Sequence, residues 1–142
     1  MKAKELMIGD WVISNKRRKN EIVQVVSIDG GTNCCWLDAD CYSGVVSYKD
    51  IKPIPLTAEI WGANGFNVGD YTVWKYNCGC YLLVVNPEIG KTCIYETHGH
   101  FTSGFETKSL QTDSFRYVHE FQHALRLLGL VELADDFNPP HP

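Results

Sequence analysis

The sequence lacks any hydrophobic run long enough to cross a membrane. A transmembrane helix needs about 20 consecutive apolar residues, and no stretch of the 142 residues approaches that length. The opening residues, MKAKELMIGDWV, also lack the apolar segment of a secretory signal. We therefore expect a cytoplasmic protein with no membrane partner.

An excess of positive charge is absent as well. The formal net charge is −4, which excludes a generally basic nucleic-acid-binding protein but leaves room for a local basic patch. Six cysteines are present. Without an export signal, the reducing cytosol favours free thiols over disulfides.

Several catalytic patterns are missing. The segment DGGTN has glycines but lacks the lysine and the following helix of a phosphate-binding loop. No nucleophile elbow and no Ser/His/Asp pattern is visible. The sequence therefore contains no complete catalytic set of these types.

Aromatic residues and turn formers are plentiful, with four Trp, seven Tyr, six Phe, twelve Gly and six Pro. This mixture favours short strands separated by turns. About five brief β-type runs lie between Met7 and Ile54. They predict a small SH3-like β-barrel over residues 1–55.

The connector IKPIPLT separates this barrel from a second unit over residues 56–142, because its prolines oppose helix and interior strand. Thr57 can cap a short helix, and further strands should form a small antiparallel sheet. A closing helix over residues 114–128, with Asp113 as N-cap and Gly129 after its end, should pack on that sheet. The predicted class is α+β, and the tail after the helix is expected to fray.

The predicted buried face of the closing helix has apolar residues at spacings of 3, 4 and 3: Val118, Phe121, Leu125 and Leu128.

The same helix contains HEFQH, residues 119–123. In zinc peptidases this pattern places two histidines on one helix face, where His119 and His123 would bind the metal and Glu120 would act as general base. A third ligand at the usual spacing is missing, although Glu132, Asp135 and Asp136 lie within reach. We therefore predict no catalytic residues and keep a zinc-dependent metallopeptidase as the alternative.

A second set of metal-ligand residues consists of Cys78, Cys80, His98 and His100. Spacing of two places both members of each pair on one face of a strand, so neighbouring strands could combine them into a zinc site. A Cys-Gly-Cys turn flanked by small buried residues is the simpler interpretation. We predict no metal and no cofactor, with zinc as the alternative.

The basic run Lys16, Arg17, Arg18 and Lys19 lies in the predicted first hairpin turn, and Trp11 and Trp36 offer aromatic surfaces in the same unit. These residues form the predicted binding surface. A protein partner is favoured over nucleic acid, because an acidic chain with one basic turn would bind nucleic acid weakly. A weak nucleic-acid-binding module is the alternative.

Three segments, ELMIGDWV, IKPIPLTAEIWGANGF and FRYVHEFQHALRLLGLVEL, together resemble a family of short uncharacterised proteins from Bacteroides-type bacteria and their phages and mobile elements. In that family the closing helix commonly reads YVHQLQN, which implies that Glu120 and His123 are substitutions in a helix that does not bind zinc. The resemblance implies a phage or mobile-element origin and no activity. We predict a non-enzymatic accessory protein that binds another protein through its barrel.

Overall fold

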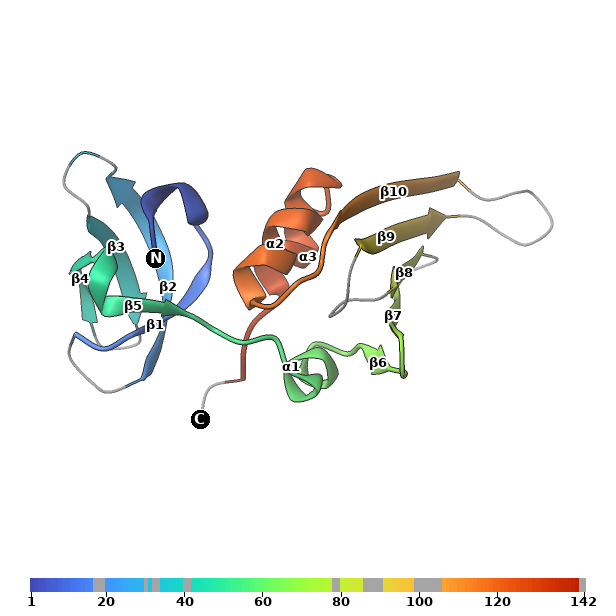
Figure 1. Ribbon diagram of the computed structural model, residues 1–142, viewed down its shortest axis with the longest axis horizontal. Helices are drawn as coiled ribbons and strands as arrows, with labels where there is room; N and C mark the ends of the chain where they lie inside the picture. Colours follow the sequence, from blue (N-terminus) through green and yellow to red (C-terminus); the bar gives the residue numbers. More distant parts are fainter. Residues whose placement is uncertain are drawn as a thin grey trace.

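The computed structural model describes residues 1–16, 20–29, 31, 34–39, 42–77, 80–85, 91–98 and 106–140. In these residues two five-stranded antiparallel sheets lie on opposite sides of the C-terminal helices (Figure 1). The predicted α+β class is confirmed. None of the helices in the described part of the chain is both long enough and apolar enough to cross a membrane.

The first sheet has the strand order β4-β3-β2-β1-β5. Its strands are β1 (Trp11–Ser14), β2 (Glu21–Asp29), β3 (Cys34–Ala39), β4 (Tyr42–Ser47) and β5 (Ile51–Pro53), with short 3-10 helices η1 (Ala3–Glu5) and η2 (Tyr48–Asp50). The five strands expected before Pro55 are confirmed. No ladder joins β4 to β5 in the described residues, so they form an open sheet and not a closed barrel.

The second sheet has the order β10-β9-β8-β7-β6. Its strands are β6 (Asn67–Val68), β7 (Thr72–Asn77), β8 (Cys80–Val85), β9 (Lys91–His98) and β10 (Glu106–Asp113). Asn77 pairs with Cys80, so the expected hairpin between β7 and β8 is confirmed. Asp113 pairs with Lys91 at the end of β10, which makes it a strand residue and not the predicted helix cap.

Local capping contacts fix where α1 and α2 begin. In α1 (Ala58–Ala63) the Thr57 hydroxyl accepts a hydrogen bond from the Ile60 amide at 3.4 Å, as expected for its N-cap. The helix α2 (Val118–Leu127) begins four residues later than predicted. Glu120 fixes this start, because its carboxylate accepts hydrogen bonds from the amides of Arg116 and Tyr117 at 2.7 and 3.1 Å.

The end of α2 follows the sequence prediction, but the tail does not. Gly129 has a φ of +79°, and the Leu130 amide donates to the Leu125 carbonyl at 2.9 Å, which closes the helix. A further helix, α3 (Val131–Asp136), then brings Phe137 into the core at 1% exposure. The expectation of a fraying tail is therefore wrong for the residues up to 140, because apolar burial holds them in place.

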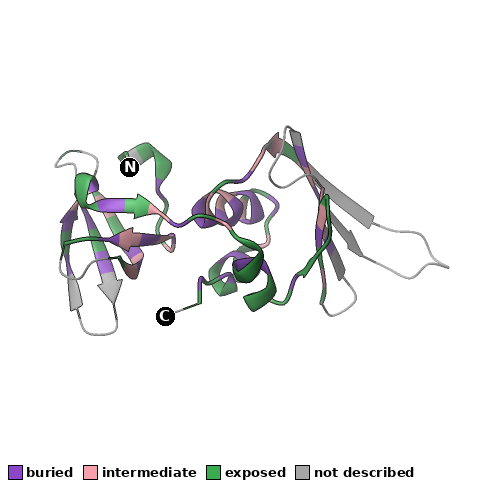
Figure 2. Cartoon of the chain, turned by 60° about the horizontal axis from the view of Figure 1, so that its bottom comes forward, coloured by how far each residue is buried: buried purple, intermediate pink, exposed green. Residues whose placement is uncertain are grey.

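The largest core lies between the second sheet and the helices (Figure 2). Trp61 of α1, Phe121 of α2 and Phe137 meet edge to face, with ring centroids 4.6 to 5.5 Å apart. The predicted inward stripe of α2 is confirmed, since all four of its members are buried: Val118, Phe121, Leu125 and Leu128. Residues of the first sheet, including Trp11 and Ile13, pack against the edge of the same core.

We expect Phe121→Ala to lower the free energy of unfolding by about 3–5 kcal/mol, because the side chain is fully buried among aromatic rings. Leu127→Ala on the same helix is the matched control, since Leu127 is 73% exposed and should change stability by less than about 0.5 kcal/mol. Urea denaturation measures both. Equal losses at the two positions would contradict the orientation of α2.

Candidate functional site

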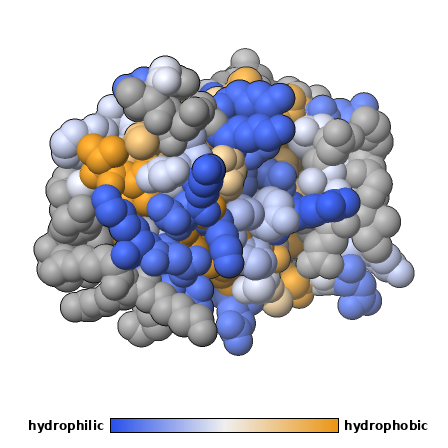
Figure 3. Space-filling view, turned by 60° about the vertical axis from the view of Figure 1, so that its left-hand side comes forward, coloured by the Kyte–Doolittle hydropathy of each residue, from blue (hydrophilic) through white to orange (hydrophobic). Residues whose placement is uncertain are grey.

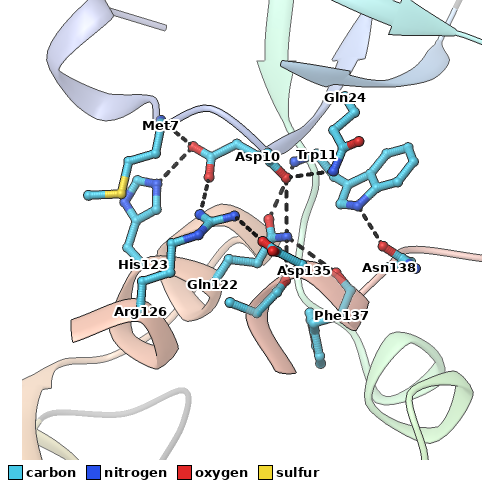
Figure 4. A network of polar contacts seen from close by, with 12 residues as sticks. Met7, Asp10, Trp11, Gln24, Gln122, His123, Arg126, Asp135, Phe137 and Asn138 are labelled. Carbon is cyan, nitrogen blue, oxygen red and sulfur yellow. Dashed lines mark hydrogen bonds and ion pairs between the residues drawn. The ribbon is translucent and has the colours of Figure 1, made fainter. Parts of the chain in front are cut away.

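The HEFQH segment lies where the first sheet meets α2 (Figure 4). We call this contact the joint and define it by Gly9, Asp10 and Trp11 on one side and Gln122, His123 and Arg126 on the other. The two sides are more than 110 residues apart in the sequence, and polar contacts connect them.

Asp10 is the centre of the joint and is fully buried. Its carboxylate accepts hydrogen bonds from the Met7 amide at 2.7 Å and from Arg126 Nη1 at 2.9 Å, and it lies 2.8 Å from His123 Nε2. A buried carboxylate is tolerated only when such donors and an opposite charge replace water. Arg126 supplies that charge, and it also approaches Asp135 of α3 at 3.4 Å.

Gly9 lets the arginine come close to the backbone. Its φ of +93° lies in the region that favours glycine, and an added Cβ would meet Arg126 Nη2 at 2.8 Å. The Gly9 carbonyl accepts hydrogen bonds from Gln24 Nε2 at 3.0 Å and from Gln122 Nε2 at 3.5 Å. The Gly-Asp pair therefore serves the joint directly.

Gln122 connects three elements although it is fully buried. Its Oε1 accepts a hydrogen bond from the Trp11 amide at 3.3 Å, and its Nε2 donates to the carbonyls of Ala134 at 3.0 Å and Phe137 at 3.3 Å. Sequence reasoning missed Gln122, Asp10 and Arg126. For Gln122, the signal in the sequence was its position next to Phe121 of the apolar stripe.

Trp11, predicted to offer a binding surface, lies in the joint. Its indole Nε1 donates to Asn138 Oδ1 at 2.7 Å. The backbone of Asn138 is held in turn by the side chain of Asn64, which accepts from its amide at 2.9 Å and donates to its carbonyl at 2.8 Å. These contacts anchor the chain after α3 to both β1 and α1.

Each residue of the HEFQH alternative has a position in this arrangement. Glu120 caps α2, and His123 contacts Asp10. His119 is 5% exposed, stacks on Tyr117, and has its ring centroid 5.6 Å from that of His123. Among the described residues, no group of three or more His, Cys, Asp or Glu is placed to hold a metal ion. The guanidinium of Arg126 beside Asp10 also opposes a second cation there.

Burial lowers the pKa of His119, and the nearby His123 lowers it further, whereas Asp10, Glu120 and Glu5 raise it. Burial is the largest of these effects, because the positive imidazolium would lose its hydration in the joint. Burial therefore favours the neutral form of His119.

The second metal-ligand set is brought together only in part. Cys80 of β8 and His98 of β9 are directly opposite each other in the ladder. Cys78 and His100 lie outside the described residues. Cys34, Cys35 and Cys93 are thiols, as expected. Burial raises the pKa of Cys35, which opposes formation of a nucleophilic thiolate.

The predicted binding residues of the first unit separate into two places. Lys16 Nζ donates to the Val45 carbonyl, and Val45 pairs with Trp36 across β3 and β4. Trp36 is 47% exposed, whereas Trp11 belongs to the joint. Arg17, Arg18 and Lys19 lie outside the described residues, within the segment that connects β1 to β2.

No family model, curated protein or solved structure matches the chain. The functional proposal therefore depends on the geometry of the chain's own residues.

We expect Asp10→Ala to lower the free energy of unfolding by about 3–5 kcal/mol, because Arg126, His123 and the Met7 amide lose the buried carboxylate that they contact. Arg126→Met should also destabilise, and the double variant should recover at least about 1 kcal/mol of the summed losses. Urea denaturation of the four proteins measures this coupling. Additive losses would show that the two residues act independently.

We expect untagged protein, purified without added metal, to contain far less than one equivalent of zinc. Arg126 already contacts the Asp10 carboxylate, and the Glu120 carboxylate already accepts a hydrogen bond from the Tyr117 amide. Elemental analysis checks this. A stoichiometric metal that survives Cys80→Ser but is lost with His119→Phe would instead support the α2 alternative. The reverse result would support the Cys/His set.

Proposed function

We propose that this chain is a non-enzymatic accessory protein that binds another protein through the outer face of its first sheet. The observation that carries the proposal is the exposure of Trp36 on that face. The resemblance to proteins of Bacteroides-type bacteria, their phages and mobile elements supports a phage or mobile-element origin.

Three features support an SH3-like, strongly curled form for this sheet. All five strands contribute to one buried cluster: Val12, Val23, Val25, Cys35, Leu37, Val46 and Ile51. The register of β2 against β3 shifts at Val26, and such a bulge bends a strand. Lys16, just beyond β1, reaches β4 at Val45, although β1 and β4 would lie about 14 Å apart in a flat sheet.

The outer face carries an apolar cluster that we call the Trp36 surface: Val26, Trp36 and Val45. These side chains are 40%, 47% and 36% exposed, while their neighbours Val25, Leu37 and Val46 are buried. The cluster therefore points away from the core of its own sheet. Tryptophan is enriched among the residues that dominate protein interfaces.

The surroundings of the Trp36 surface indicate the chemistry of the partner. Where the first sheet comes forward, hydrophobic patches are small and lie among hydrophilic side chains (Figure 3). Lys16 lies at the edge of the cluster through its contact with Val45, and the following residues Arg17, Arg18 and Lys19 add positive charge in the sequence. An apolar side chain surrounded by carboxylates on a protein partner would complement this pattern.

The state of the polar clusters supports a binding role over catalysis. The carboxylates of Glu120 and Asp10 are both engaged by backbone or arginine donors. A general base or a metal ligand needs an open coordination or proton-transfer position. The HEFQH pattern therefore adds little support to a peptidase.

The test begins with a photo-crosslinking amino acid at position 45, introduced into the full chain in a Bacteroides-type host, with position 72 of the second sheet as control. The protein captured from position 45 alone is then purified and titrated against the wild-type chain. We expect Trp36→Ala to weaken this binding by about 30-fold, the effect of losing about 2 kcal/mol at a central interface residue.

Trp74→Ala is the matched control, because Trp74 is 40% exposed on the second sheet and should leave the affinity unchanged. Equal losses at Trp36 and Trp74 would contradict the assignment of the Trp36 surface. Tight, salt-sensitive binding of the wild type to RNA or DNA, abolished by reversing the charges of Arg17 and Arg18, would instead establish the nucleic-acid alternative.

A further inference from the structure

His119 is a buried titratable group without a full set of partners. His119 is 5% exposed. Within the described structure its Nδ1 is buried and has no hydrogen-bond partner. Its ring lies between Tyr117, on which it stacks, and His123, which contacts Asp10. His119 is therefore packed against the centre of the joint, while its Nδ1 has no hydrogen-bond partner among the described residues.

The charged groups around His119 come from both sides of the joint. Asp10 and Glu5 belong to the N-terminal segment, Glu120 and His123 belong to α2, and Arg126 of α2 contacts Asp10. Asp10 is already neutralised by Arg126, and the Glu120 carboxylate is occupied by the amides of the first turn. Glu5 caps the N-terminal turn by accepting from the Lys2 amide at 2.8 Å. The charges of these carboxylates raise the pKa of His119, but burial outweighs them.

We propose that the joint is an acid-sensitive switch: protonation of His119 releases the first sheet from α2, while the helices stay packed on the second sheet. A proton on His119 adds a positive charge beside His123, which shares one buried carboxylate, Asp10, with Arg126. The extra charge costs free energy there, because the joint is largely shielded from water.

Opening at the joint is favoured over global unfolding because the two sides of α2 are held differently. Polar contacts of Asp10 and Gln122 hold α2 to the first sheet, with Trp11 and Ile13 at the edge of the core. Apolar contacts of Val118, Phe121 and Leu125 hold it to the second sheet, and these contacts do not titrate.

The direction of the pH effect follows from the two states. Burial lowers the pKa of His119 in the closed joint, and in the open joint an exposed imidazole titrates near its ordinary pKa of about 6.5. Between these two values the open state binds more protons. The contribution of His119 to the stability of the closed joint is therefore fully present above about pH 6.5. It decreases as the pH falls towards the lowered pKa of the closed joint.

Amide hydrogen exchange on the full chain tests the proposal at pH 7.5 and at pH values down to 5, after correction for the intrinsic exchange rate. The Met7 amide donates to Asp10 and the Trp11 amide to Gln122, so both report on the joint. The amides of Val84 and Ile94, in the paired strands β8 and β9, report on the second sheet. We expect joint opening to increase by up to about tenfold per pH unit below 6.5, with Val84 and Ile94 unchanged.

Two variants identify the titrating residue. His119→Phe keeps an aromatic ring without a proton site and should abolish the pH dependence of joint opening. His123→Gln keeps an amide donor for Asp10 and should retain the pH dependence of joint opening. The proposal is overturned if the pH dependence survives in His119→Phe, if it disappears in His123→Gln alone, or if Val84 exchanges in step with Met7.

A measurement on the wild type covers the case in which His119→Phe does not fold. Nuclear magnetic resonance of the imidazole gives the pKa of His119 in the intact protein. A value below that of an exposed histidine, about 6.5, supports the proposal, and a value at or above it overturns the proposal.

Discussion

The relative placement of the two halves depends on one buried carboxylate. Asp10 lies where the chain enters β1, and it is fully buried. Its donors come from its own segment through Met7 and from α2 through His123 and Arg126. A buried charge without these donors would be costly, so the start of β1 and one face of α2 are held in register. Gly9 makes the approach possible, because a side chain there would collide with the guanidinium.

The HEFQH segment gains a structural explanation from this arrangement. The spacing of four that would bring two histidines to a zinc ion also places both rings on one face of a helix. In this fold that face meets the N-terminal segment, so His119 is buried and His123 contacts Asp10. Glu120 lies at the third helical position, where a glutamate commonly caps the first turn. A pattern used by metal sites can thus arise from helix capping and a polar joint.

Local signals in the sequence predicted local structure well. Thr57, Gly129 and the spacing of Val118, Phe121 and Leu125 each act within one or two turns, so their effects are visible without the fold. The N-cap at Asp113 failed because pairing with Lys91 extends β10 through that residue. The pairing of Asp10 with Arg126 joins residues 116 apart, and nothing in either segment alone specifies the other. The carboxylate that meets His123 therefore comes from the N-terminal segment, whereas the candidate third ligands Glu132, Asp135 and Asp136 all lie downstream of His123.

The contacts of α2 with the two sheets differ in chemistry. One joins the helices firmly to the second sheet, and the other sets the orientation of the first sheet. The aromatic core of Trp61, Phe121 and Phe137 joins the helices to the second sheet over a large apolar area. The first sheet has its own smaller core, which is separate from that cluster. Its attachment combines directional hydrogen bonds with the packing of Trp11, Ile13 and Ile22 against the larger core. Such bonds specify an orientation but contribute little net stability each. Trp36 lies on the face of the sheet opposite its own core, so the joint determines which way the exposed tryptophan is held relative to the rest of the molecule.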